Sequence, residues 1–352
     1  MATTDPALAL LHQGTVIPAH LLALDAERRL DERRQRALTR YYLDAGAGGL
    51  AVGVHSTQFA IRERGLYRPV LELAMHEARR WQPLGGSRPL VMIAGLSGPT
   101  AQALGEARTA RELGYHAGLL SLAALRGQDE DALIAHCQAV AEALPLIGFY
   151  LQPAVGGLHL PTSFWRRFAA IDRVLAIKMA PFNRYRTLDV LRGVVEAGAE
   201  ERIALYTGND DHIVLDLLAP FALRRGQETV TLRIRGGLLG HWSVGTRRAV
   251  ELFQRIQAAV AAGPIPAELL ALDSQVTDCN AALFDVAHDF HGCIAGCHEV
   301  LRRQGLLAGT WCLNPHEGLS PGQAEELTRV HAAYPHLHDD AFVATHRERW
   351  LA

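Results

Sequence analysis

Short runs of apolar residues alternate with longer amphipathic stretches along the first 262 residues of the chain. Most of these runs are continuously apolar, which is typical of strands that are buried on both faces. Eight strands are predicted on this basis, over residues 15–19, 49–54, 89–95, 117–122, 146–151, 174–179, 203–208 and 229–234.

The stretches between these runs predict helices, because their apolar residues recur at intervals of three and four and several of them end at glycine. Examples are residues 31–47, 98–115, 129–144 and 184–199. Buried strands joined through helices require parallel pairing with both faces of the sheet covered. Eight such units favour a closed (β/α)8 barrel, the TIM barrel of the α/β class, over an open doubly wound sheet.

The pattern changes after residue 262. Prolines punctuate residues 263–269, strand-like runs cease, and residues 267–305 read as long helices. A further helix is predicted with Ser320 as its N-cap and Pro321 at its first position. We therefore predict a barrel over residues 1–262 and a helical C-terminal region over residues 263–352.

The composition, the net charge and the cysteine pattern limit the classes of protein to which the chain could belong. Of the 352 residues, 49% are hydrophobic and 20% are charged, and the formal net charge of -2 creates no field that favours nucleic acid or an anionic membrane. No basic segment precedes the first apolar stretch, and no window approaches about eighteen uninterrupted apolar residues, so a cytoplasmic location is expected. The five scattered cysteines are expected to be reduced thiols.

One cation differs from all the others. The chain has 35 lysines and arginines, and the only lysine among them is Lys178, at the end of the apolar run 174–179. Arginine stays protonated, whereas a buried lysine can lose its proton and attack a carbonyl carbon. Lys178 is therefore a candidate Schiff-base nucleophile. The alternative is a lysine that reaches from the strand end to water or pairs with a carboxylate.

Candidate partners of Lys178 come from the C-terminal ends of other strands, where TIM barrels place their active sites. Tyr150 ends the fifth strand, and His55, Ser56 and Thr57 follow the second. Imine formation with a 2-oxo acid needs an uncharged amine, a proton relay and donors for the substrate carboxylate. Tyr150 is the predicted relay and the other three are predicted substrate contacts. The ordinary alternatives are a tyrosine with a packed ring and polar residues that satisfy loop backbone.

Other strand ends supply further candidates. Asn183 and Arg184 follow the sixth strand and could hold a distal carboxylate or hydroxyl, or simply cap a helix. Predicted strands seven and eight lead into "TGNDD" and "RGGLLGH". Gly208, Asn209 and Gly236 in these segments are predicted substrate contacts, since glycine allows a ligand to approach the backbone closely.

Several motifs together resemble a known family. "YLQPAVGG" and "AIKMAP" place Tyr150 28 residues before Lys178. This pair is similar to the "YN.P" tyrosine and "GiK" lysine of the dihydrodipicolinate synthase and N-acetylneuraminate lyase superfamily. Residues 94–120 resemble its third and fourth strand-helix units, "TGNDD" its strand-seven motif and "RGGLLGHWSV" its strand-eight glycine motif. The resemblance covers about residues 14–262.

This resemblance implies a class I aldolase barrel that works without a cofactor or metal. Lys178 would form a Schiff base with pyruvate or a related 2-oxo acid, and Tyr150 would relay protons. The resemblance also implies a homo-oligomer, either a dimer or a tetramer.

The chain departs from dihydrodipicolinate synthases proper at three places. Their "GTTGE" loop appears as "GVHSTQF", which leaves open whether His55, Ser56 or Thr57 takes the role of the threonine. Their substrate-binding arginine corresponds to Val155, and their "PYY" motif to residues 123–125. We therefore predict a Schiff-base lyase, acting in C–C cleavage, C–C formation or dehydration, other than the lysine-biosynthesis enzyme. The alternative is a barrel without turnover that binds a ligand or regulates.

Two groups of residues contain side chains that could bind a metal. The segment "HDFHGCIAGCHEV" at 288–300 contains Cys293 and Cys297, but a continuous helix without a second ligand cluster is not the pattern of a thiolate zinc site. A metal-dependent enzyme that uses His55, His241 and Asp210 is a third hypothesis for the function. The prediction from the sequence is no metal.

Overall fold

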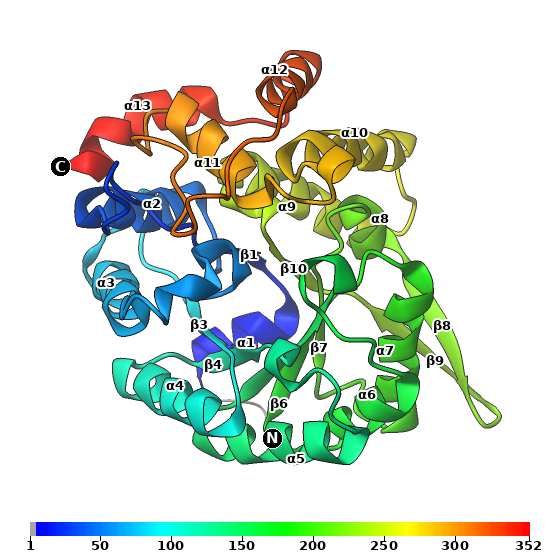
Figure 1. The fold of residues 1–352 in the computed structure, drawn as a ribbon. Coiled ribbons are helices and arrows are strands. Elements are labelled where there is room, and N and C mark those ends of the chain that lie inside the picture. The colour runs from blue at the N-terminus through cyan, green and yellow to red at the C-terminus, as the bar shows by residue number, and fades with distance from the viewer. Residues whose placement is uncertain (1–4) are drawn as a thin grey trace.

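The barrel predicted from the alternating pattern is confirmed. The computed structural model describes residues 5–352, and eight parallel strands follow one another around a ring with helices outside it (Figure 1). A bridge between Ala19 and Ala51 joins the first and last strands of this order. In spatial order the strands are β1 (Val16–Pro18), β10 (Gly236–Leu239), β7 (Ala204–Thr207), β6 (Val174–Ala180), β5 (Leu146–Leu151), β4 (Ala117–Leu120), β3 (Val91–Leu96) and β2 (Gly49–Val52).

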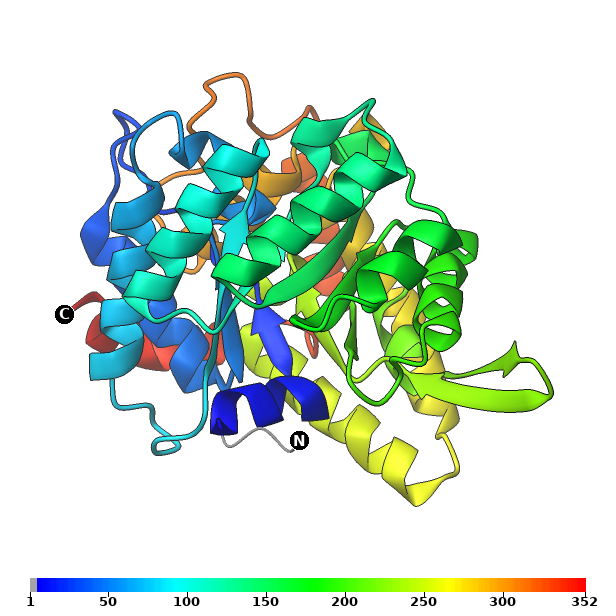
Figure 2. The ribbon, with the colours of Figure 1, turned by 90° about the horizontal axis from the view of Figure 1, so that it is seen from below.

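The outer layer consists of helices, and short polar side chains cap the first turns of three of them. Asp31, Asp129 and Asn183 each accept a backbone N–H at the start of a helix. A separate helix, α1 (Pro6–Gln13), lies across the N-terminal end of the barrel (Figure 2). The outer helices are α2 (Glu32–Ala45), α3 (Tyr67–Arg80), α4 (Thr100–Leu113), α5 (Glu130–Ala143), α6 (Thr162–Ala169), α7 (Arg184–Glu196), α8 (Ile213–Leu218) and α9 (Thr246–Ala262).

The eighth barrel strand is not where the sequence prediction placed it. Residues 229–234 fall largely in β9 (Glu228–Arg233), which pairs antiparallel with β8 (Pro220–Arg225) in a hairpin that projects from the barrel (Figure 1). Buried and exposed side chains alternate along part of β9, as expected for a strand with one solvated face. The barrel position is taken by β10, which reads as "GGLL" and lacks β-branched residues.

The C-terminal region packs against the barrel layer. It contains α10 (Ala267–Leu283), α11 (Cys293–Arg303), α12 (Gln323–Ala333) and α13 (Asp340–Leu351). α13 lies against α2, and α10 lies against α8. The helix predicted after Ser320 is confirmed as α12, but the predicted cap was wrong. Gly322 at φ 82° caps α12, and the hydroxyl of Ser320 instead donates to Asp285. Within residues 5–352, no helix has the length and apolar character needed to cross a membrane.

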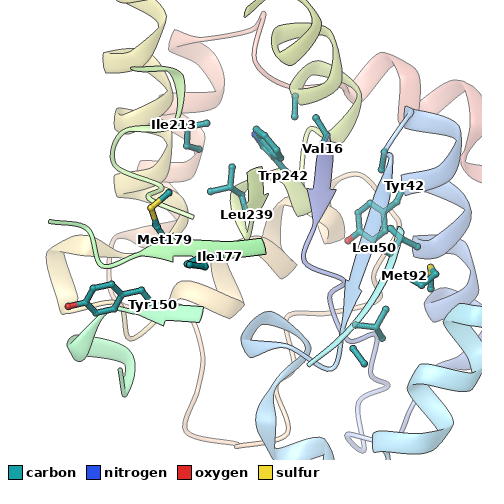
Figure 3. Packing of buried hydrophobic residues seen from close by; sticks show 14 of the residues in the cluster. Val16, Tyr42, Leu50, Met92, Tyr150, Ile177, Met179, Ile213, Leu239 and Trp242 are labelled. Atoms are coloured by element: carbon teal, nitrogen blue, oxygen red, sulfur yellow. The ribbon is translucent and has the colours of Figure 1, made fainter. Parts of the chain in front are cut away.

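Side chains along the strands alternate between two hydrophobic clusters. On β6, Ala176 and Ala180 belong to the cluster inside the barrel, whereas Ile177 and Met179 belong to the cluster between the strands and the outer helices (Figure 3). Successive side chains of a strand point to opposite faces of the sheet. Lys178 therefore points into the barrel.

Candidate active site

A cavity of about 70 Å³ lies at the C-terminal ends of the barrel strands, large enough for a few water-sized groups. The segment that follows α10 forms part of its wall, through Phe284, Phe290, Cys293 and Ile294. The polar side chains at the cavity come from four strand ends and are His55, Ser56, Gln152, Lys178 and Asp210.

Lys178 is held in this cavity with 9% of its surface exposed. Its Nζ lies 4.5 Å from the centroid of the Phe149 ring, whose face favours the cation. Burial acts in the opposite direction and is the largest effect, so the pKa of Lys178 is lowered despite the nearby Asp210 carboxylate. An amine with a lowered pKa is available as a nucleophile at a pH where an exposed lysine is not.

Gly208 leaves the space that the Lys178 side chain occupies. A Cβ atom at position 208 would lie 2.4 Å from Cε of Lys178 and 2.9 Å from Cβ of Ala180. The backbone after β7 thus approaches the lysine more closely than any other residue type allows. The sequence prediction assigned Gly208 to substrate contact, and it does line the cavity.

Gly208→Ala is expected to slow any reaction of the Lys178 amine by about 10- to 100-fold, because a displacement of about 1 Å can cost that much. The measurement is the rate at which a 2-oxo acid is trapped on Lys178 by borohydride. Gly105→Ala is the matched control, since position 105 lies in α4 and a Cβ there meets nothing within 4 Å. Equal trapping rates in the two variants would contradict this role of Gly208.

Asp210 is the second ionisable group that burial perturbs strongly in this cavity. It is 9% exposed, and its Oδ1 has no hydrogen-bond partner. Its backbone carbonyl accepts a hydrogen bond from Nδ2 of Asn280 at 2.5 Å. Burial raises the pKa of Asp210, while Lys178 and the backbone N–H of His241 act in the opposite direction. The sequence prediction named this residue only as a metal ligand.

The three residues after β2 that could take the role of the family's threonine differ in whether they line the cavity. His55 and Ser56, in the 3₁₀ turn η1 (His55–Thr57), line the cavity, and burial lowers the pKa of His55 to about 4, so its ring is neutral at neutral pH. Thr57 is fully buried and does not line it. Its hydroxyl donates to the carbonyl of His20 at 2.6 Å and accepts the N–H of Gly53 at 3.0 Å.

Tyr150 lies outside the cavity, so the prediction that it stands beside Lys178 was wrong. Its ring belongs to the outer cluster (Figure 3) and lies 5.3 Å from the ring of Trp165, centroid to centroid. Its hydroxyl accepts the backbone N–H of Leu160 at 3.3 Å. The phenol therefore faces the helices, while the amine faces the barrel interior.

A β-bulge explains this error. The pairing of β5 with β6 shifts by one residue between Leu146 and Ile147. Beyond the shift, Phe149 is level with Lys178, and Tyr150 is level with Met179. Because side chains alternate with a period of two, a shift of one residue moves a side chain to the other face of the sheet.

Asn209 and Arg184 meet outside the cavity, at a buried carboxylate. The amide of Asn209 donates to Asp216 at 3.0 Å and to the hydroxyl of Thr187 at 3.2 Å. Arg184 pairs with the same Asp216 at 2.5 Å. Asn183 accepts the N–H of Arg186 and caps α7. These contacts fix the loops after β6 and β7, and none of the three predicted residues lines the cavity.

Gly236 lies at the other end of the barrel, contrary to the prediction. It begins β10, and a Cβ there would lie 2.6 Å from the carbonyl oxygen of Thr15 and from Cε1 of Tyr206. The error follows from the misplaced eighth strand, since "GGLL" is the strand and not its loop. Gly240, which follows β10, lines the cavity instead.

The possible metal ligands do not gather at the cavity. Between residues 5 and 352, the set of three ligand side chains whose atoms come within 4.8 Å of one another is His331, His338 and Asp340, in the C-terminal region. Nδ1 of His241 instead lies 2.5 Å from Oδ1 of Asn280. The hypothesis of a metal enzyme built on His55, His241 and Asp210 therefore gains no support from the geometry.

Comparisons with known proteins agree with this architecture. A family model described as the dihydrodipicolinate synthetase family matches residues 12–333. The 4-hydroxy-tetrahydrodipicolinate synthase of Synechococcus elongatus is 27% identical over 212 residues, or 58% of this chain and 65% of that protein. The N-acetylneuraminate lyase of Citrobacter koseri is 25% identical over 207 residues, with the same two shares. This chain thus spans 65% of the length of these curated relatives.

A solved structure is similar to this protein over nearly the whole chain. Dihydrodipicolinate synthase from Oceanobacillus iheyensis superposes with a TM-score of 0.73 at 15% sequence identity, covering 94% of this chain and 99% of that one. At this identity the likeness shows a shared fold.

Proposed function

Because the chain belongs to the dihydrodipicolinate synthetase family, we propose that it is an aldolase-type lyase whose Lys178 forms a Schiff base with pyruvate or a related 2-oxo acid. The observation that carries the proposal is the position of Lys178. It is the only lysine of the chain, and it is buried at the C-terminal end of a barrel strand with a lowered pKa. A charged surface role does not account for an amine in this position.

The walls of the cavity support a small substrate. The hydroxyl of Ser56 is a donor for the carboxylate of a 2-oxo acid, while Val155 and Leu151 offer apolar surface. Val155 stands where the resemblance expects a substrate-binding arginine. These features support a reaction other than the lysine-biosynthesis step. Neither a cofactor nor a metal is part of the proposal, and a homo-oligomer stays a prediction.

Reductive trapping tests the proposal. Borohydride added to the protein with pyruvate, 2-oxobutyrate or 2-oxoglutarate is expected to leave a stable adduct on Lys178, located by mass spectrometry of peptides. The assay is clean, because the α-amino group is the one other primary amine that the sequence itself provides. Absence of an adduct with all of these acids would contradict the Schiff-base function.

A second candidate function is ligand binding without turnover, and the outward position of Tyr150 favours it. A barrel that has lost its relay could keep a ligand cavity and a regulatory role. Binding of pyruvate that is unchanged in Lys178→Ala, together with no trapped adduct in the unaltered protein, would support this candidate over the lyase.

A further inference from the structure

Imine formation at Lys178 needs a group that transfers protons inside the cavity. The nitrogen loses a proton when it attacks the carbonyl carbon, and the carbonyl oxygen must gain protons before it leaves as water. The Tyr150 hydroxyl cannot do this, because it lies on the outer face of β5. The relay must come from another residue at the cavity wall.

On the basis of the proposed function, we propose that Asp210 is the catalytic residue that transfers protons between nitrogen and oxygen while Lys178 forms its imine. Asp210 and Lys178 line the same cavity from the ends of neighbouring strands, β7 and β6. Nothing in the resemblance noted in the sequence gives this role to the strand-seven acid.

One oxygen of the Asp210 carboxyl has no partner in the protein. Oδ1 is buried and has no hydrogen-bond partner, whereas most buried polar atoms have one. The backbone of Asp210 is held by Asn280, whose Nδ2 donates to its carbonyl oxygen. Asp210 and Lys178, both in the described part of the chain, line the same cavity without a direct ion pair between them.

The proposed step balances in atoms and charge. The neutral amine of Lys178 attacks the carbonyl carbon, and the π electrons move to the oxygen. The protonated Asp210 gives its proton to this oxygen, takes a proton from the nitrogen and passes it to the same oxygen, and the C–O bond breaks to release water. The products are an iminium cation on Lys178 and a carboxylate on Asp210, so no external oxidant, reductant or proton is needed.

The protonation states of the cavity suit this step. Burial lowers the pKa of Lys178 and raises the pKa of Asp210, so the neutral amine and the neutral acid occur together in a larger fraction of molecules than they would in an exposed pair. The other ionisable groups are less suitable. The pKa of His55 is lowered to about 4, and the pKa of the Cys293 thiol is raised to about 12. Asp211, the neighbouring acid on the same loop, does not line the cavity.

Asp210→Asn tests the proposal directly. We expect the variant to trap pyruvate on Lys178 at least about 100-fold more slowly, which is the scale of general acid–base catalysis. A purely electrostatic role of Asp210 predicts the opposite, because removing an anion lowers the pKa of Lys178 further and increases the fraction of free amine. Asp211→Asn and Tyr150→Phe are the matched controls, and both are expected to react at nearly the rate of the unaltered protein.

The pH profile separates catalysis from a structural role. The reactive state of the pair holds one proton, so the trapping rate of the unaltered protein should rise and then fall with pH. In Asp210→Asn the fall at high pH should disappear, and circular dichroism should show an unchanged fold. If the unaltered protein traps pyruvate and Asp210→Asn does so equally fast, the inference about Asp210 fails while the proposed function stands. If the unaltered protein traps none, both fail.

Discussion

Replacing Lys178 with arginine is expected to abolish Schiff-base chemistry, although the positive charge is kept. Guanidinium stays protonated and does not form an imine with a 2-oxo acid. Loss of a covalent nucleophile typically removes roughly 10⁴- to 10⁶-fold of rate. The side chain is 9% exposed beside Gly208, so the longer arginine also disturbs packing. Lys178→Met, which has nearly the same shape, is therefore the second variant.

Exchange of the methyl protons of pyruvate measures this effect without knowledge of the second substrate. An imine on Lys178 can lose a methyl proton to form an enamine and regain a deuteron from D₂O, and nuclear magnetic resonance follows the loss of signal. Both variants should show the exchange rate of pyruvate in buffer alone. Exchange at the rate of the unaltered protein in Lys178→Met would remove the lysine from the mechanism.

The buried position of Lys178 at a strand end was predictable from the sequence, because the evidence for it is local. A lone lysine among arginines, at the end of an apolar run, indicates both a buried strand and a need for an amine. The parallel barrel was predictable for the same reason, since it depends on a repeated pattern. Neither prediction depends on the pairing register between neighbouring strands.

Tyr150 was not predictable, because its direction depends on pairing between strands. A spacing of 28 residues places Tyr150 on the strand next to Lys178. One extra residue in the pairing of β5 with β6 then puts the two side chains on opposite faces of the sheet. The sequence around the bulge is continuously apolar, so periodicity gives no sign of it. The sequence offered Asp210 only as a metal ligand, because its burial and its unpartnered oxygen are properties of the folded chain.

The sequence of the predicted eighth strand carries a signal that it lies outside the barrel. Residues 229–234 read T-V-T-L-R-I, an alternation of polar and apolar residues rather than a continuous apolar run. Alternation is typical of an antiparallel strand with one solvated face, which is what the hairpin provides. The true barrel strand, "GGLL", is hard to recognise because it begins with two glycines. These positions need glycine, since a Cβ atom there would collide with Tyr206 or Trp242.

The carboxylate of Asp44 links the C-terminal helix to the barrel, and its removal is expected to destabilise the whole molecule. The side chain of Asp44, in α2, is fully buried. It accepts hydrogen bonds from Nε1 of Trp81 at 3.0 Å and Nε1 of Trp350 at 2.6 Å, and pairs with Arg349 at 2.5 Å. Since Trp350 and Arg349 belong to α13, this network spans the proposed boundary between residues 1–262 and residues 263–352.

Asp44→Ala is expected to lower the free energy of unfolding by about 3–5 kcal/mol, because it leaves Arg349, a buried indole N–H and a partly buried indole N–H without their partner. Chemical denaturation followed by circular dichroism measures the change. Glu112→Ala removes an exposed ion pair with Arg68 and is the matched control, with an expected change within about 1 kcal/mol. One transition at a lower denaturant concentration would mean that the C-terminal helices unfold together with the barrel. A new early transition would mean that they form a separate unit, and equal midpoints in the two variants would contradict the role of Asp44.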